Sequence, residues 1–261
     1  MEKWLVTDYD GTLRNGTDGG VDPKDLAFVK EFINDNNHVV IASGRPYEMI
    51  LREAREMGIK PSLYITNAGA VIRDDNGKLL YKKTIPHDEL KPVVDYLKTL
   101  NLHTLIYATP DEEMYLFTDN PSKYPDGSLK RRITNQSFDD LYDMDLVCFK
   151  IMEDRQTLDN LIKHVKKVAP DLTIINNNDS NLVEIHPPHS SKGDAVKIMQ
   201  ELEHLKPEQI ITAGDDDNDI TMLSWFDNSF VIKQPYNKEI QKYGKHKIDH
   251  LWEIKNYLGQ N

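Results

Sequence analysis

Two clusters of carboxylates carry the chemistry that this sequence could perform. The first is Asp8-Tyr9-Asp10-Gly11-Thr12, and the second is Gly214-Asp215-Asp216-Asp217-Asn218-Asp219. Each follows a short apolar run that predicts a buried strand, and the carboxyl ends of parallel strands meet at one edge of a sheet. Carboxylates gathered there repel one another unless they are protonated or bind a cation. Oxygen ligands without His or Cys favour Mg²⁺ over Zn²⁺, so the sequence predicts a magnesium site.

Magnesium held by few carboxylates completes its shell with water and phosphate oxygens, which indicates phosphoryl chemistry. Ser43-Gly44 can offer a hydroxyl and backbone N–H groups to phosphate, and Lys192 can supply a positive charge. Each signal also has a plainer interpretation when taken alone. The first cluster could be a solvated turn, Ser43 to Pro46 a strand-to-helix turn, the Asp215 cluster a helix N-cap, and Lys192 a surface lysine.

Taken together and in order, these residues resemble the four motifs of the haloacid dehalogenase superfamily. The motifs are Asp-x-Asp-x-Thr, a Ser or Thr after the second strand, a Lys, and Gly-Asp-x-x-Asn-Asp. The sequence shows them as Asp8 to Thr12, Ser43-Gly44-Arg45, Ser191-Lys192-Gly193 and Gly214 to Asp219. A large insertion separates the second motif from the third, so the chain looks like the Cof-type sugar-phosphatase branch, where such an insertion is a cap over the substrate.

The resemblance implies a role for each matching residue. Asp8 is the nucleophile that forms an aspartyl-phosphate, and Asp10 is the general acid–base. The metal ligands are Asp8, Asp10 through its backbone carbonyl, Asp215 and Asp219. The residues that hold the phosphate or substrate are Ser43, Gly44, Arg45, Lys192 and Asn218, with Asn218 and Asp219 also orienting Lys192 or the waters of the metal. For Arg45 an exposed salt bridge is the alternative. The family often has Asn-Gly-Ala after the third strand, but Ala68 occupies the usual Asn position here, so this segment is left out of the catalytic set.

Alternating strand and helix patterns predict an α/β fold: a Rossmann-like parallel sheet with helices on both faces. An inserted α+β segment interrupts it, with candidate specificity residues Tyr115, Arg131, Lys150 and Glu184. We expect a catalytic core over residues 1–82 and 186–261 and a cap over residues 83–185. In the core, the expected strands are 4–7, 39–42, 63–66 and 210–213, the helices are 22–33, 46–57, 191–205 and 220–225, and a hairpin joins 71–72 to 79–81. In the insertion, the expected helices are 88–100 and 154–168, the strands are 103–107, 113–118, 146–152, 172–176 and 182–185, and residues 120–136 are irregular.

Composition limits the partners. Asp and Glu outnumber Lys and Arg by 43 to 32, and the net charge of −11 argues against nucleic acid or an anionic membrane. No signal peptide or spanning segment is visible, so we expect a cytoplasmic protein, as a monomer or homodimer. The single Cys148 is expected to be core packing. His186 and His189 flank two prolines and are expected in a loop or hinge, while Lys130-Arg131-Arg132 is expected to be a solvated loop.

The sequence therefore predicts a Mg²⁺-dependent phosphatase acting on a small phosphorylated metabolite, with a sugar phosphate as the leading class. Two alternatives stay open. In the first, a phosphomutase or phosphotransferase passes the phosphoryl group from Asp8 to another hydroxyl. In the second, a non-enzymatic signalling module carries a long-lived phosphoaspartate.

Overall fold

The computed structural model describes residues 1–16, 19–100, 102–109, 114–118, 131–133, 135–177 and 181–258; within residues 110–137 only the backbone is described. The chain forms two compact units. The core unit comprises Met1–Tyr81 and Ser191–Asn261, and the inserted unit comprises Lys82–Ser190.

The core unit is built on one eight-stranded sheet with the order β14-β13-β12-β1-β2-β3-β4-β5. The strands from β14 to β3 are parallel to their neighbours, and β4 pairs antiparallel with β3. The two strands that carry the acidic clusters, β1 and β12, are adjacent. The strand bounds are β1 Trp4–Asp8, β2 His38–Ala42, β3 Leu63–Thr66, β4 Val71–Asp74, β5 Leu79–Lys82, β12 Ile210–Gly214, β13 Ser229–Ile232 and β14 His246–Ile248.

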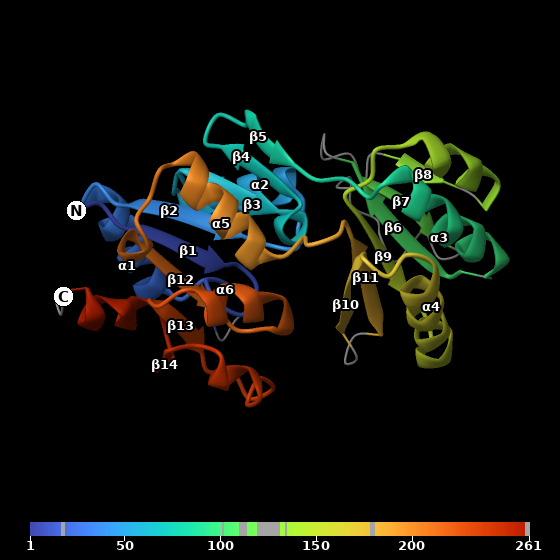
Figure 1. The fold of residues 1–261 in the computed structure, drawn as a ribbon. Coiled ribbons are helices and arrows are strands. Elements are labelled where there is room, and N and C mark those ends of the chain that lie inside the picture. Colours follow the sequence, from blue (N-terminus) through green and yellow to red (C-terminus); the bar gives the residue numbers. More distant parts are fainter. Residues whose placement is uncertain are drawn as a thin grey trace. The chain divides into compact units, whose positions relative to one another are not determined.

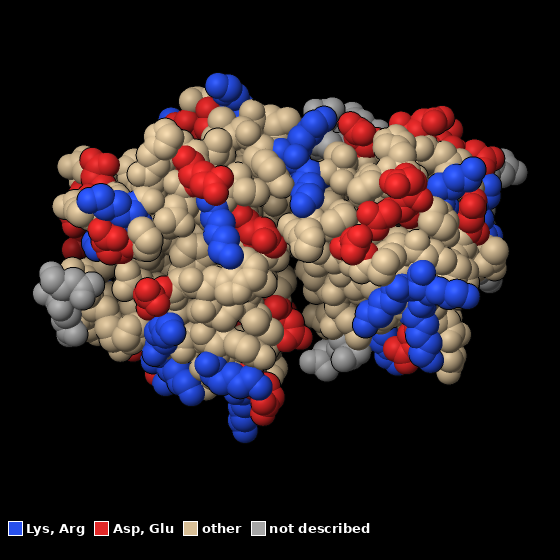
Figure 2. Space-filling model, in the orientation of Figure 1, with Lys and Arg blue, Asp and Glu red and all other residues tan. Residues whose placement is uncertain are grey.

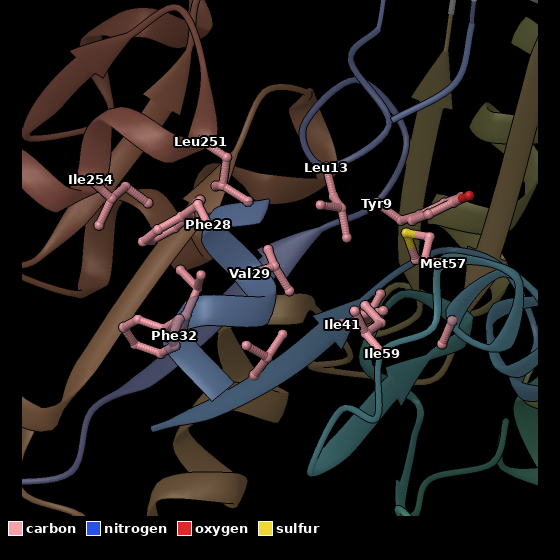
Figure 3. Packing of buried hydrophobic residues seen from close by; sticks show 14 of the residues in the cluster. Tyr9, Leu13, Phe28, Val29, Phe32, Ile41, Met57, Ile59, Leu251 and Ile254 are labelled. Carbon is pink, nitrogen blue, oxygen red and sulfur yellow. The ribbon is translucent and has the colours of Figure 1, made fainter. Parts of the chain in front are cut away.

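Helices cover both faces of this sheet because its strands are apolar on both sides (Figure 1). In β1, Leu5 belongs to the cluster formed with α1 (Pro23–Asn34), α2 (Tyr47–Met57) and the short helical segment η7 (Leu251–Tyr257). Trp4 and Val6 point to the opposite face and join α5 (Lys192–Leu202) and α6 (Ile220–Trp225). Phe28, Val29 and Phe32 of α1 lie beside Leu251 and Ile254 of η7 (Figure 3).

The inserted unit has a six-stranded sheet with the order β10-β11-β9-β6-β7-β8. Its pairs are antiparallel except that β7 and β8 are parallel. Helices α3 and α4 pack on one face, against Leu105, Phe149 and Val183 among others. The bounds are α3 His87–Thr99, β6 Thr104–Ala108, β7 Met114–Thr118, β8 Arg131–Ile133, β9 Cys148–Met152, α4 Arg155–Val168, β10 Thr173–Asn177 and β11 Leu182–His186.

The fold class predicted from the sequence is confirmed, and three details differ. Arg131–Ile133 forms strand β8 within the stretch expected to be irregular. His186 is the last residue of β11, paired with Thr173 and fully buried, rather than part of a loop. The inserted unit therefore extends beyond residue 185 to Ser190, whose backbone N–H donates to Thr173 Oγ1 over 3.3 Å. Cys148 is buried, as expected.

Candidate active site

Strand register brings the acidic clusters together. Thr7 of β1 pairs with Ala213 of β12, so the residues that end or follow these strands, Asp8 and Asp215, are neighbours. On the other side Asp8 pairs with Ala42 of β2, which places Ser43 next to it. Asp8, Ser43 and Asp215 are all buried, at 5%, 1% and 1% exposure. The sheet thus assembles, at one edge, three polar residues from distant parts of the sequence.

Lys192 is the positive centre of this group. It is the first residue of α5, whose N-cap Ser191 accepts a hydrogen bond from the Asp194 N–H. The Lys192 ammonium lies 2.5 Å from Asp8 Oδ1 and 2.6 Å from Asp219 Oδ1. It also donates to Asn218 Oδ1 over 3.2 Å. Although it is fully buried, this lysine is compensated by two carboxylates, which is the condition under which a buried charge is tolerated.

The site carries an excess of negative charge. Asp8, Asp215 and Asp219 supply three carboxylates for the one ammonium of Lys192. Burial raises the pKa of Asp8 well above its usual value; the Lys192 charge opposes this, and Asp219 and Asp215 add to it. Burial and the nearby Asp219 also raise the pKa of Asp215 to about 7. The protein alone therefore does not fully stabilise the ionised carboxylates, and a cation would.

The donor set fits a hard divalent cation. One carboxylate oxygen from each of Asp8, Asp215 and Asp219 lies within 4.8 Å of the others, and all three residues are buried. Asp8 Oδ2 is buried and accepts no hydrogen bond from the described residues. An oxygen in this state is suited to bind a metal. Asp219 is more fully engaged: its Oδ2 accepts from the backbone N–H groups of Asp215 and Asp216, and its Oδ1 accepts from Lys192, so its one remaining acceptor position lies beside a positive charge. The geometry therefore favours Asp219 as a residue that orients the site.

Asp10 differs from the buried carboxylates in its exposure and its partners. Its side chain is 46% exposed and accepts two hydrogen bonds from Arg45, of 2.7 and 2.6 Å. Arg45 also pairs with Glu53 over 3.2 Å, and Glu53 accepts from the Tyr9 hydroxyl over 2.8 Å. Arg45 was expected to contact phosphate or substrate, or else to form a salt bridge; in this structure it pairs with the carboxylate assigned as the acid–base.

The loop after β2 is braced by the loop after β3. Ser43 Oγ accepts from the backbone N–H of Arg45 over 3.1 Å, which closes the turn around Gly44. The Asn67 N–H donates to the Arg45 carbonyl, and the Ala68 N–H donates to the Ser43 carbonyl. Asn67 is buried with a positive φ of 49°. The segment set aside in the sequence therefore supports the expected phosphate loop through its backbone.

Two hydroxyl groups at the site had no role in the sequence prediction. Thr12 Oγ1 donates to Asp215 Oδ1, and Tyr236 Oη donates to Asp215 Oδ2, both over 2.6 Å. Thr12 belongs to the first motif, so the sequence could have indicated that it lies at the site. Tyr236 belongs to no motif; the only signal was that it follows an apolar run, Phe230–Ile232, that forms the neighbouring parallel strand.

Of the expected specificity residues, Lys150 and Glu184 lie opposite each other on β9 and β11. Their side chains form an ion pair of 3.1 Å, and Glu184 also contacts His186 over 2.9 Å. The side chains of Tyr115 and of Lys130-Arg131-Arg132 lie outside the described residues.

The doubly covered sheet and its lysine–carboxylate site define a hydrolase of the phosphatase class. A family model of haloacid dehalogenase-like hydrolases matches residues 5–250, and the chain belongs to this family. An uncharacterized protein of Mycoplasma capricolum is 36% identical, over 98% of this chain and 100% of its own length. The 5-amino-6-(5-phospho-D-ribitylamino)uracil phosphatase YitU of Bacillus subtilis is 23% identical, over 85% of this chain and 83% of its own.

Solved structures show the same fold with its inserted unit. A protein of Thermotoga maritima superposes with a TM-score of 0.83 at 19% identity, covering 100% of this chain and 99% of that one. A sugar phosphatase of subclass IIB of the superfamily gives a TM-score of 0.81 at 17% identity, covering 98% of both chains. Among the described residues, no helix combines the length and apolar composition that a bilayer span requires.

Proposed function

We propose that this chain is a Mg²⁺-dependent phosphatase that hydrolyses a small phosphate monoester, foremost a sugar or sugar-alcohol phosphate, through an aspartyl-phosphate on Asp8. The observation that carries the proposal is the buried pairing of Asp8 with Lys192, in which the second Asp8 oxygen accepts no hydrogen bond from the residues that the structure describes. The Lys192 ammonium therefore holds Asp8 Oδ1, while Asp8 Oδ2 is available to interact with a metal ion or with the substrate.

In the proposed reaction Asp8 attacks phosphorus in line and the ester oxygen leaves. Lys192 holds Asp8 in place and, with the loop of Ser43 and Gly44, stabilises charge on the phosphoryl oxygens. Asp10 donates a proton to the leaving oxygen and then accepts one from the water that hydrolyses the acyl phosphate. Asp8 and Asp215 would hold Mg²⁺, with Asp219 orienting the site and the Asp10 carbonyl as a further expected ligand. When bound, the ion supplies positive charge that neutralises the phosphate and the carboxylates.

The substrate class is proposed from relatives and from the insertion. The names of the matched phosphatases specify a phosphorylated ribityl compound and a sugar phosphate. We propose that the inserted unit acts as the cap that selects such compounds, with Lys150 and Glu184 as candidate contacts, and that the physiological partner is a phosphorylated metabolite rather than a nucleic acid or a membrane. On the face drawn in Figure 2, basic side chains are interspersed with acidic ones, without a continuous basic stripe among the described residues.

The test is phosphate release from a panel of sugar and polyol phosphates, with Mg²⁺ and with EDTA. Asp8→Asn is expected to abolish Mg²⁺-dependent release, and Asp10→Ala to lower kcat on the order of 10² to 10⁴-fold. Asp217→Asn is the control, because this exposed acid lies in the neighbouring loop that carries Asp215 and should leave activity unchanged. Full activity of Asp8→Asn would refute the proposal. Phosphorus NMR of the products distinguishes release to water from transfer to a second hydroxyl, and a phosphoaspartate that persists without turnover would instead support a signalling role.

A further inference from the structure

The loop after β13 contacts both loops that carry the expected metal ligands. Its four residues, Gln234 to Asn237, reach the Asp8–Thr12 loop with one side chain and Asp215 with two. Gln234 Nε2 donates to the Gly11 carbonyl over 2.8 Å and to Asn15 Oδ1 over 2.5 Å. Asn237 Nδ2 donates to the Asp215 carbonyl and to the Ile232 carbonyl, both over 2.8 Å. We call residues 234–237 the bridging loop.

Tyr236 is the bridging-loop residue that reaches a ligand-forming atom. Its hydroxyl donates to Asp215 Oδ2 over 2.6 Å, while Thr12 donates to Asp215 Oδ1 over the same distance. Two donors on the two oxygens fix the plane of the carboxylate. Each oxygen of an ionised carboxylate has two acceptor positions, so one position on each stays available for a cation.

Gly11 makes this contact sterically feasible. It adopts a φ of +88°, and a Cβ built on it would lie 2.4 Å from Asp215 Oδ2 and 2.7 Å from the Tyr236 hydroxyl oxygen. The backbone of Gly11, in the first motif, therefore lies directly against the Tyr236–Asp215 pair. Tyr236 itself is 60% exposed, so its ring contributes little to the hydrophobic core.

We propose that Tyr236 is a positioning residue that sets the affinity of the Asp8–Asp215 site for Mg²⁺ by holding the Asp215 carboxylate in its ligating orientation; this rests on the proposed function. Hydrogen-bond partners of metal ligands typically contribute 10- to 100-fold in metal affinity. Because the ring is largely exposed, Tyr236→Phe leaves no cavity in the hydrophobic core.

The experiment is calorimetric titration of Mg²⁺ into metal-free wild type, Tyr236→Phe and Tyr243→Phe, with Tm measured in EDTA and kcat measured at saturating Mg²⁺. Tyr236→Phe is expected to weaken Mg²⁺ binding by about 10- to 100-fold, with Tm unchanged and kcat largely recovered at saturation. Tyr243, which packs on the Leu223–Val231–Ile240 cluster, is the matched tyrosine away from Asp215 and should bind Mg²⁺ like the wild type.

The outcomes separate the two proposals. Equal Mg²⁺ affinity in wild type and Tyr236→Phe would overturn the positioning role and leave the proposed function intact. A kcat that stays low at saturating Mg²⁺ would also overturn it, because the residue would then act in the chemical step. A wild-type protein that binds no Mg²⁺ would refute the metal-dependent function itself.

Discussion

At the scale of the residue, Lys192 shows how burial and charge are balanced in this site. A lysine without exposed surface is strongly disfavoured unless it is paired, and its ammonium here contacts Asp8 and Asp219. Burial lowers the pKa of Lys192, yet the two carboxylates more than offset it and raise the pKa above its ordinary value. Lys192 therefore stays charged at neutral pH and keeps Asp8 in place.

Whether Arg45 positions Asp10 can be tested by kinetics. It makes two hydrogen bonds to Asp10, which a lysine cannot reproduce because it lacks the planar fork of a guanidinium. We expect Arg45→Lys to lower kcat by about tenfold with little change in KM, because the acid–base is misplaced while the substrate still binds. Steady-state kinetics with a phosphate ester measures both constants.

Arg14→Lys is the control for Arg45, since Arg14 makes a single 3.3 Å contact with Asp10 and is 42% exposed. Its kinetics should stay near those of the wild type. If Arg45→Lys raised KM and left kcat unchanged, the phosphate- or substrate-binding role expected from the resemblance would be favoured over positioning of Asp10.

At the scale of the element, α1 is held by its apolar face. Phe28 is 2% exposed and packs with Leu251 and Ile254 of η7 (Figure 3). Phe28→Ala should lower the free energy of unfolding by about 3 to 5 kcal/mol, because it removes buried area and leaves a cavity. Lys30→Ala on the exposed face of the same helix should change it by less than about 0.5 kcal/mol. Urea unfolding followed by circular dichroism gives both values, and equal values would contradict this packing.

The sheet of the inserted unit contains a charge cluster whose contribution depends on pH. Burial disfavours the charged form of Glu184, but Lys150 and His186 more than offset it and lower the pKa of this carboxyl from 4.5 to about 2. A lowered native pKa means that the stabilisation is complete above about pH 4.5 and is lost as the pH falls toward 2. The loss attributable to Glu184 is at most about 3 kcal/mol.

We therefore expect Glu184→Gln to lower the free energy of unfolding at pH 6 by about 2 to 3 kcal/mol and to reduce its dependence on pH between 4.5 and 2. Urea unfolding at pH 6 and at pH 2.5 measures both effects. Asp159→Asn is the control, because it breaks a largely exposed pair with Arg155 worth less than about 1 kcal/mol. If Glu184→Gln kept the wild-type pH dependence of the free energy of unfolding, the Glu184–Lys150 ion pair would not be the cause of that dependence.

At the scale of the whole molecule, the core unit is assembled from two separate stretches of chain. Leu80 and Tyr81, at the end of the first stretch, pack on the cluster that contains Ala195 and Val196 from the start of the second. The two points where the insertion leaves and re-enters the core unit therefore share one hydrophobic cluster. The core unit buries this cluster with its own residues.

We expect that replacing residues 82–190 with a flexible linker of about six residues yields a core unit that folds cooperatively and binds Mg²⁺. If the inserted unit selects the substrate, this variant should discriminate among phosphate esters at least about tenfold less than the full chain. Calorimetric Mg²⁺ titration and the substrate panel test the two parts. An unfolded variant would contradict the independence of the core unit, and unchanged selectivity would contradict the cap role.

Residue types and their spacing were enough to predict the fold class and the two acidic loops that meet at the site. Apolar runs that end at Asp8 and before Asp215 are local patterns, and the parallel sheet then requires that they meet. The partner that each side chain takes is known only from the three-dimensional arrangement. The pairing of Arg45 with Asp10 and of Tyr236 with Asp215 joins residues far apart in the chain, and the engagement of both Asp219 oxygens depends on where α5 and the Asp215 loop lie. These contacts follow from side-chain packing and direction in three dimensions, which residue type and spacing do not encode.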